Sequence, residues 1–91
     1  MATKFTPECL ARINSMFHGI QDLLEQLYDR WRDEREYEDI KDYQKVLAEK
    51  LPEGFTMIRA TKRPFGFQVS VEGGTVQVFC GAQAVGWKQI A

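Results

Sequence analysis

Apolar residues in the first third of the chain recur at gaps that alternate between three and four residues. Their positions are Leu10, Ile13, Phe17, Ile20, Leu24, Leu27 and Trp31. Because an α-helix has about 3.6 residues per turn, this spacing places the side chains in one stripe. Thr6 suits an N-cap and Pro7 the first helical position. The pattern predicts a helix over residues 7–32. Met16 and Leu23 widen its stripe, which favours packing in a core over a two-stranded zipper.

The stripe ends at Glu34 and Glu38, which occupy the next heptad positions. A second stripe follows at Tyr37, Ile40, Tyr43, Leu47, Ala48 and Leu51. On one straight helix, the second stripe would face the opposite side from the first. We therefore expect a turn near residues 32–37 and a second helix over residues 36–51, stopped by Pro52. The alternative is a bent continuous helix shared between two chains.

The last part of the chain has the alternation of β-strands. Residues 67–71 and 76–80 alternate apolar and polar side chains, and Gly73 and Gly74 lie between them, which is a hairpin signal. With the two glycines as the turn, one face of the hairpin is wholly apolar. The predicted pairs on that face are Val71 with Val76, Val69 with Val78, and Phe67 with Cys80.

Two further strands complete the predicted sheet. Residues 55–62 form the preceding strand, with Ile58 and Ala60 facing inward and Met57, Arg59 and Thr61 outward. A loop over residues 63–66 follows it, and residues 85–90 form a short last strand. The predicted fold is a single two-layer α+β domain over residues 1–91. An N-terminal antiparallel helical hairpin packs on a three- to four-stranded antiparallel β-meander at residues 55–90.

Composition narrows the class of protein. Apolar residues make up 44% of the chain and charged residues 27%, as in globular proteins. No apolar run approaches the roughly 20 residues that a membrane span needs, and the first residues do not resemble a signal peptide. We expect a small soluble cytoplasmic protein with no membrane contact. Cys9 and Cys80 are then expected to be buried and reduced.

The residues that could carry chemistry do not form a recognisable catalytic or metal site. His18 is the only histidine, and Cys9 lies nine residues before it, which points the two side chains to opposite sides of a helix. The acidic residues of segment 29–39 alternate with arginines, as on a solvated helix face. We therefore predict a protein without catalytic residues, metal or cofactor.

One motif points to ligand binding. The run from Lys62 to Val69, Lys-Arg-Pro-Phe-Gly-Phe-Gln-Val, is followed by Val-Phe-Cys at residues 78–80. These two segments resemble the paired aromatic motifs of cold-shock domains and, more loosely, of RNA-recognition motif domains. The resemblance implies that Phe65, Phe67 and Phe79 are rings for base stacking and that Arg59, Lys62 and Arg63 contact phosphates. The predicted hairpin register instead puts Phe67 and Phe79 on opposite faces, which favours a core role for Phe67 and a loop-plugging role for Phe65.

The outer face of the predicted sheet is the preferred binding surface. It would carry Met57, Arg59, Thr61, Gln68, Ser70, Gln77 and Phe79, with Trp87 close by. The net charge is −1, but residues 52–91 hold four basic and two acidic side chains, which gives +2. This excess is too small for a strong duplex binder.

We predict a non-enzymatic protein-binding module, such as an adaptor, an inhibitor or an assembly component. It would act through its sheet face, its first helix or both. The partner is another protein or a second copy of this chain. The expected partner-binding residues are Met57, Arg59, Lys62, Arg63, Phe65, Phe79 and Trp87. The alternative is a single-stranded nucleic-acid-binding protein that uses segment 59–67 together with Phe79.

Overall fold

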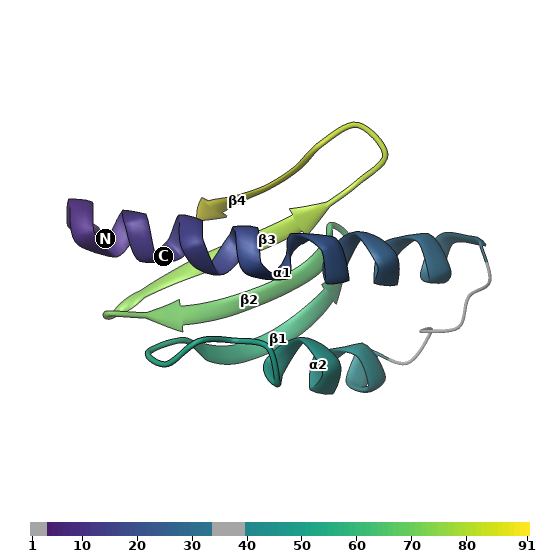
Figure 1. Ribbon diagram of the computed structural model, residues 1–91, viewed down its shortest axis with the longest axis horizontal. Coiled ribbons are helices and arrows are strands. Elements are labelled where there is room, and N and C mark those ends of the chain that lie inside the picture. Colours follow the sequence, from purple (N-terminus) through teal and green to yellow (C-terminus); the bar gives the residue numbers. More distant parts are fainter. Residues whose placement is uncertain (1–3, 34–39) are drawn as a thin grey trace.

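The computed structural model describes residues 4–33 and 40–91 of the chain. It contains two helices, α1 (Pro7–Asp33) and α2 (Ile40–Ala48). Four strands follow: β1 (Thr56–Lys62), β2 (Phe65–Val71), β3 (Gly74–Cys80) and β4 (Val85–Gln89). The strands form one antiparallel sheet in the order β1-β2-β3-β4 (Figure 1). The predicted α+β class and the β-meander are confirmed.

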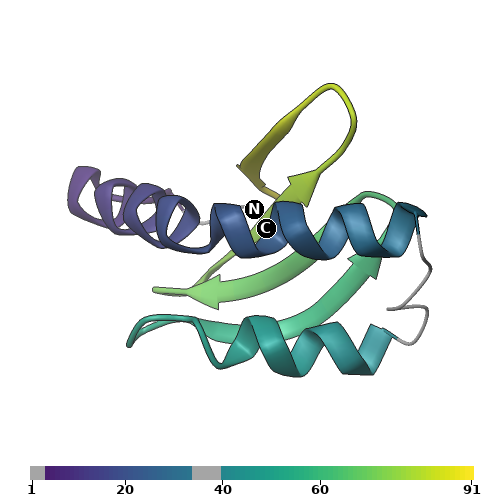
Figure 2. The same cartoon turned by 45° about the vertical axis from the view of Figure 1, so that its right-hand side comes forward.

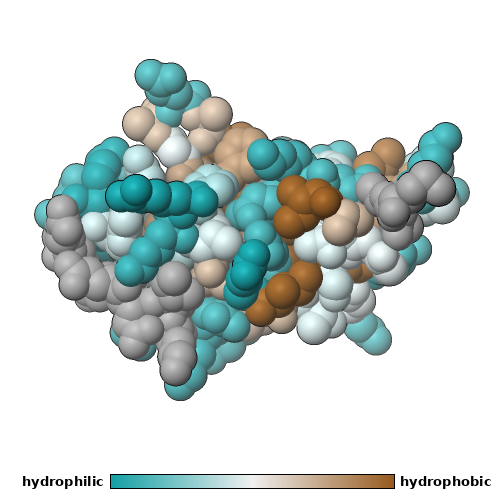
Figure 3. Space-filling model, turned by 180° about the vertical axis from the view of Figure 1, so that it is seen from behind, coloured by the Kyte–Doolittle hydropathy of each residue, from teal (hydrophilic) through white to brown (hydrophobic). Residues whose placement is uncertain are grey.

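Both helices lie on the same face of the sheet, with α1 over β3 and α2 against β1 (Figures 1 and 2). The core between the layers consists of apolar side chains from both. Its most completely buried members are Ile13, Ile20, Leu24, Tyr43, Leu47, Phe67, Val69, Val76 and Val78. Neither described helix covers the other face, which is mainly hydrophilic with separate apolar patches when it is seen from behind (Figure 3). We call it the open face.

Helix α1 follows the predicted stripe except at its start. The Cys9 backbone N–H donates to the Thr6 hydroxyl at 3.1 Å, which confirms the N-cap. Leu10 was expected in the core but is 39% exposed, whereas the preceding Cys9 is buried. A strict seven-residue repeat drifts by about 20° per heptad around a straight helix, so the end of a long stripe rotates off the buried face.

Helix α2 is shorter than the predicted helix over residues 36–51. Tyr43 and Leu47 are fully buried, as their stripe predicts, whereas Ala48 is exposed. The chain leaves the helix after Ala48 through turns that run up to Pro52. The predicted turn near residues 32–37 falls mostly on residues 34–39, outside the described residues. The helical hairpin therefore remains a prediction.

The β2–β3 hairpin has the predicted faces but a different register. Val69 pairs with Val76 and Phe67 with Val78, which is two residues away from the predicted pairing. The turn residues are Glu72 and Gly73, whose positive φ values of 47° and 83° suit a tight primed turn. Gly74 belongs to β3 instead. The predicted register was wrong, but a shift of two residues leaves every side chain on its predicted face.

Gly74 is needed for packing and does not form part of the turn. A Cβ atom at this position would lie 2.5 Å from the buried ring of Phe5. The ring therefore reaches the strand only because glycine has no side chain. Phe5 precedes α1, so the register of this hairpin is linked to a contact with a distant part of the chain.

A β-bulge changes the predicted orientation of β1. Met57 pairs with Val69 and Arg59 with Gln68, so Ile58 is the extra residue between them. Ile58 was predicted to face the core but is 45% exposed. Met57 was predicted to face outward but packs against the core, because the bulge reverses the alternation on its N-terminal side. Ala60 is buried as expected.

The connection between β1 and β2 is tighter than predicted. The predicted loop over residues 63–66 is reduced to Arg63 and Pro64, with a cis peptide bond between them. Phe65 therefore lies in β2 and does not plug a loop. At the other end of the sheet, β4 occupies five of the six residues predicted for the last strand.

Candidate functional site

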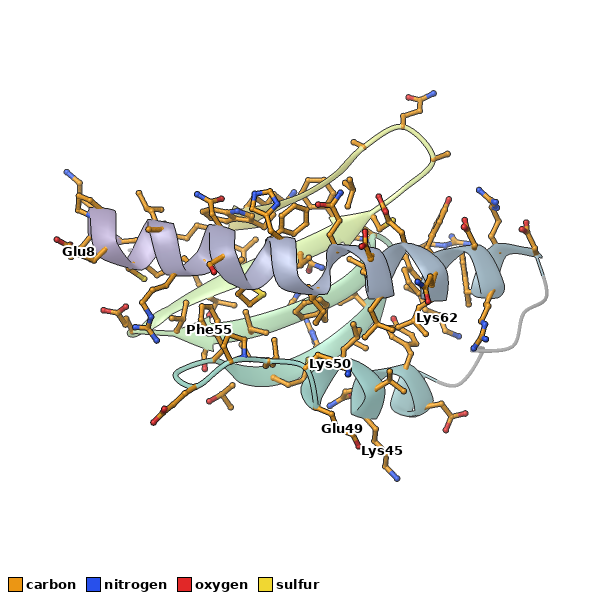
Figure 4. All side chains as sticks on the ribbon, in the orientation of Figure 1. Glu8, Lys45, Glu49, Lys50, Phe55 and Lys62 are labelled. Atoms are coloured by element: carbon orange, nitrogen blue, oxygen red, sulfur yellow. The ribbon has the colours of Figure 1, made fainter. Side chains whose placement is uncertain are left out.

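A pocket of about 630 Å³ opens where β1 turns into β2 and β3 turns into β4. Two residues of α1 complete its wall. The lining residues are Tyr28, Trp31, Lys62, Arg63, Pro64, Phe65, Phe79, Cys80 and residues 81–84. We call it the loop-end pocket. Lys62, labelled in Figure 4, marks this end of the molecule.

An aromatic cluster forms one wall of the loop-end pocket. The ring of Phe65 stacks on Tyr43, with centroids 4.8 Å apart, and contacts Trp31 at 5.4 Å and Tyr28 at 5.6 Å. Phe65 is only 3% exposed, so it supports the wall and offers little ring surface of its own. Tyr28 and Trp31 are half-buried. Their rings are therefore held in place while part of each faces the pocket.

The cluster is anchored on the sheet through Tyr43. Its hydroxyl donates to the Thr61 carbonyl oxygen in β1. Burial raises the pKa of Tyr43 to about 12, because the interior disfavours the phenolate. The hydroxyl therefore stays protonated as a donor at neutral pH, and it fixes the ring on which Phe65 stacks.

Phe79 reaches the pocket from the open face. It pairs with Gly66 on one side and Gly86 on the other, so two glycines flank it across the strands. A Cβ atom at Gly86 would lie 3.3 Å from the Phe79 ring, which therefore packs directly over that glycine. The ring is half-buried and bridges the open face and the loop-end pocket.

The charged groups that line the pocket are basic. Lys62 and Arg63 are exposed, and the described lining contains no Asp or Glu. On α1, Arg32 forms ion pairs with Asp29 at 3.3 Å and Asp33 at 2.9 Å. An adjoining hollow, which shares Tyr28 and Cys80 with the pocket, is lined by Glu25 and Asp29. The hydrogen bond from Arg32 lowers the pKa of Asp33. The charged side chains of its described lining are therefore basic, and the rest of the lining is mainly apolar.

The open face beside the pocket carries a ladder of polar side chains. Arg59 Nε donates to Gln68 Oε1 at 3.0 Å, and Gln68 Nε2 donates to Gln77 Oε1 at 3.0 Å. Gln77 Nε2 in turn donates to the Thr61 hydroxyl at 3.1 Å and to the Val78 carbonyl at 2.8 Å. Gln77 is only 3% exposed. These hydrogen bonds therefore join four polar side chains from β1, β2 and β3 into one chain across the face.

The structure brings four of the seven predicted binding residues together. Lys62, Arg63, Phe65 and Phe79 all line the loop-end pocket, whereas Arg59 lies beside it on the open face. The other two lie elsewhere. Met57 borders a hollow against α2. Trp87 pairs with Val78, so its side chain is on the helix side, where its Nε1–H donates to Asn14 Oδ1 at 2.9 Å.

The prediction from the sequence did not place Tyr28 and Trp31 in this site. Trp31 was read as the last residue of the core stripe, and Tyr28 lies three residues before it. One signal was present: two large rings one helical turn apart, at the point where the apolar stripe fails. Only the fold shows that they face the β1–β2 turn, more than thirty residues away.

A second hollow, of about 270 Å³, is organised by Arg12. Its guanidinium donates to Glu72 Oε2 at 3.0 Å and to the Glu53 carbonyl oxygen at 3.1 Å, and it lies 5.7 Å from the centroid of the Phe55 ring. Phe55 and Lys50, labelled in Figure 4, belong to the same border. The guanidinium of Arg12 therefore links α1 to the loop at Glu53 and to the turn at Glu72, and we assign it a structural role.

The thiols and the histidine do not converge in the described part of the chain. Cys9 and Cys80 are buried, and burial is the main cause that raises the pKa of each thiol. Neighbouring acids add to the rise, Glu72 at Cys9 and Glu25 at Cys80. His18 is exposed. Within residues 4–33 and 40–91, no group of three or more His, Cys, Asp or Glu side chains is arranged to hold a metal ion.

Comparison with protein-family models, curated proteins and solved structures finds no match to this chain. Among the described residues, no helix has the length and apolar character of a membrane span.

Proposed function

We propose that this protein is a small non-enzymatic module that binds an acidic segment of another protein. One aromatic or large apolar side chain of the partner would occupy the loop-end pocket, and neighbouring carboxylates would meet Lys62 and Arg63. The observation that supports this proposal most strongly is the make-up of the pocket. Half-buried rings and two exposed cations line it, and its described lining contains no acidic residue.

The pocket has the properties that give a binding site affinity. Tyr28 and Trp31 are held by Phe65, so little side-chain freedom would be lost when a partner binds. Anchor residues of protein interfaces are often aromatic side chains in pockets, surrounded by a polar rim. Lys62 and Arg63 supply such a rim, and their charge would also speed the association of an acidic partner.

Single-stranded nucleic acid is the second candidate. It is supported by the sheet itself, because none of the four strands contains Asp or Glu, whereas Arg59, Lys62 and Lys88 all lie in strands. The stacking platform implied by the cold-shock resemblance does not form, however. Phe65 and Phe67 are buried on the helix side, and Phe79 alone of the three rings reaches the open face. We therefore favour a peptide ligand.

A peptide selection tests the proposal. A random peptide library displayed on phage is panned against the immobilised protein and, in parallel, against the Lys62→Ala/Arg63→Ala double variant. We expect the wild-type protein to enrich peptides in which an aromatic or large apolar residue is flanked by Asp or Glu. The double variant should not enrich them, because it lacks the cationic rim.

The matched control is Lys45→Ala/Lys50→Ala, which removes two exposed positive charges on the helical layer and leaves the loop-end pocket intact. It should enrich the same peptides as the wild type. Labelled oligothymidylate, measured by fluorescence anisotropy at low salt, provides the comparison with the second candidate. Enrichment that is indifferent to Lys62 and Arg63, or binding of the oligonucleotide alone, would contradict the peptide proposal.

A further inference from the structure

Strand β4 forms an edge of the sheet, and no described segment lies along its outer side (Figures 1 and 2). Edge strands present backbone groups that can pair with another chain. The opposite edge, β1, is interrupted by the bulge at Ile58 and has α2 packed against it. Strand β4 pairs with β3 in regular register and contains no proline. It is therefore the edge that can accept another strand.

The hydrogen bonds at the two ends of the β3–β4 ladder show which backbone groups of β4 point outward. The Ile90 N–H donates to the Thr75 carbonyl at 2.9 Å, and the Gly81 N–H donates to the Ala84 carbonyl at 2.8 Å. Hydrogen-bonded and non-hydrogen-bonded pairs alternate along an antiparallel ladder. The pair of Val78 and Trp87 is therefore a non-hydrogen-bonded pair. The N–H and C=O groups of Trp87 point away from β3.

We infer that the protein forms a homodimer in which β4 pairs antiparallel with β4 of a second copy. The two-fold axis passes beside Trp87, so that the two Trp87 residues exchange their backbone hydrogen bonds and the two four-stranded sheets become continuous. The inference does not depend on the proposed function, although Phe79, which lines the loop-end pocket, would lie beside this interface.

The side chains of β4 are complementary to themselves in this register. Lys88 is the only charged residue of the strand, and it would lie opposite Gly86 of the second copy instead of opposite Lys88. Gly86 leaves room there, and the Phe79 ring packs over it. The ammonium group of each Lys88 would thus lie beside a Phe79 ring, in a cation–π arrangement. A register shift of two residues would place the two Lys88 side chains opposite each other, so their repulsion disfavours that register.

The helices leave space for the second copy. Where α1 lies over β3, three strand spacings, or about 14 Å, would separate the two α1 helices, whereas Asn14 nearer the start of α1 bonds Trp87 of β4. Packed helices need about 8–10 Å between axes, so they would not clash. Asn14 of α1 accepts the hydrogen bond from Trp87. Leu10 lies one helical turn before Asn14, on the same side of α1, and is 39% exposed. The dimer would reduce this exposure.

The test is the mass of the protein in solution, measured by sedimentation velocity over a range of micromolar concentrations, for wild type and two variants at Val85. Val85 lies opposite Cys80 in a non-hydrogen-bonded pair, so Val85→Pro removes an outward N–H and keeps the bonds to β3. We expect a dimer for the wild type and for Val85→Ala. For Val85→Pro we expect the dissociation constant to rise about tenfold or more.

Amide hydrogen exchange at Trp87 gives a second readout that needs no variant. In the dimer this amide should exchange slowly at high protein concentration and quickly after dilution. A wild-type protein that stays monomeric would overturn the inference. So would a dimer that Val85→Pro leaves unchanged, a dimer that Val85→Ala disrupts equally, or exchange at Trp87 that is independent of concentration.

Discussion

Replacing Arg12 by methionine should destabilise the protein by about 2 kcal/mol. Methionine keeps most of the aliphatic stem and removes the guanidinium, which contacts Glu72, the Glu53 carbonyl and the Phe55 ring. The ion pair is about half exposed on both sides, so it contributes only about 0.2–1 kcal/mol. The hydrogen bond to the carbonyl contributes about 0.5–1.5 kcal/mol, and the cation–π contact about 0.5–1 kcal/mol.

Urea unfolding followed by tryptophan fluorescence measures this loss. The midpoint should fall with the m-value unchanged, and Tm should fall by about 10 °C in a domain of this size. Lys45→Met is the control, because it removes an exposed positive charge from α2 and should change stability by less than about 0.5 kcal/mol. A double-mutant cycle with Glu72→Gln should give a coupling of about 0.2–1 kcal/mol that shrinks at high salt. If Arg12→Met unfolds like the wild type, Arg12 does not join α1 to the two loops.

Three further predictions follow from burial. Leu24→Ala should lower the free energy of unfolding in urea by about 2–5 kcal/mol. Leu10→Ala should lower it by less than about 1 kcal/mol, because Leu10 is 39% exposed. Equal losses for the two variants would contradict the position of α1. Because the pKa of Tyr43 is raised to about 12, its contribution to stability is complete below about pH 10 and is lost as the pH rises through 12. Tyr43→Phe should reduce this alkaline loss, and an unchanged pH profile would refute it. Cys9 and Cys80 should react with a thiol reagent only in urea, because burial keeps both protonated and covered; fast reaction of the folded protein would contradict this.

The sequence predicted which residues of β2 and β3 face the helices, because their alternation survives a register shift of two residues. It could not predict the register itself. Either Gly73 or Gly74 can adopt positive φ, and the choice depends on Phe5 packing against Gly74. The bulge at Ile58 has no local signal either, because its flanking residues are ordinary strand formers. Contacts between distant segments decided both features.

In the candidate site, too, the sequence revealed local motifs but not the contacts between distant segments. Lys62, Arg63, Phe65 and Phe79 were found because they form a local basic and aromatic motif around two strands. Their roles changed in the structure, since Phe65 supports the wall while Tyr28 and Trp31 from α1 provide accessible ring surface. Arg12 lies outside the apolar stripe from which α1 was predicted. Its contacts with Glu72 and Glu53 depend on loops that the periodicity of α1 does not reveal.

The two proposed surfaces have a joint consequence, because antiparallel pairing at Trp87 turns the second copy end for end. The loop over residues 81–84, which lines the loop-end pocket, joins β4 three residues from Trp87 at the two-fold axis, or about 10 Å along the strand. The two pockets would therefore open toward opposite ends of the joined sheet, roughly 20 Å apart along the strand direction, with the Phe79 ring of each pocket beside the interface. A dimer of this kind can hold two copies of a ligand segment, or one partner that carries two such segments on a linker long enough to span them. Val85→Pro should therefore reduce the avidity for a partner that carries two such segments. It should leave the affinity for a single peptide unchanged.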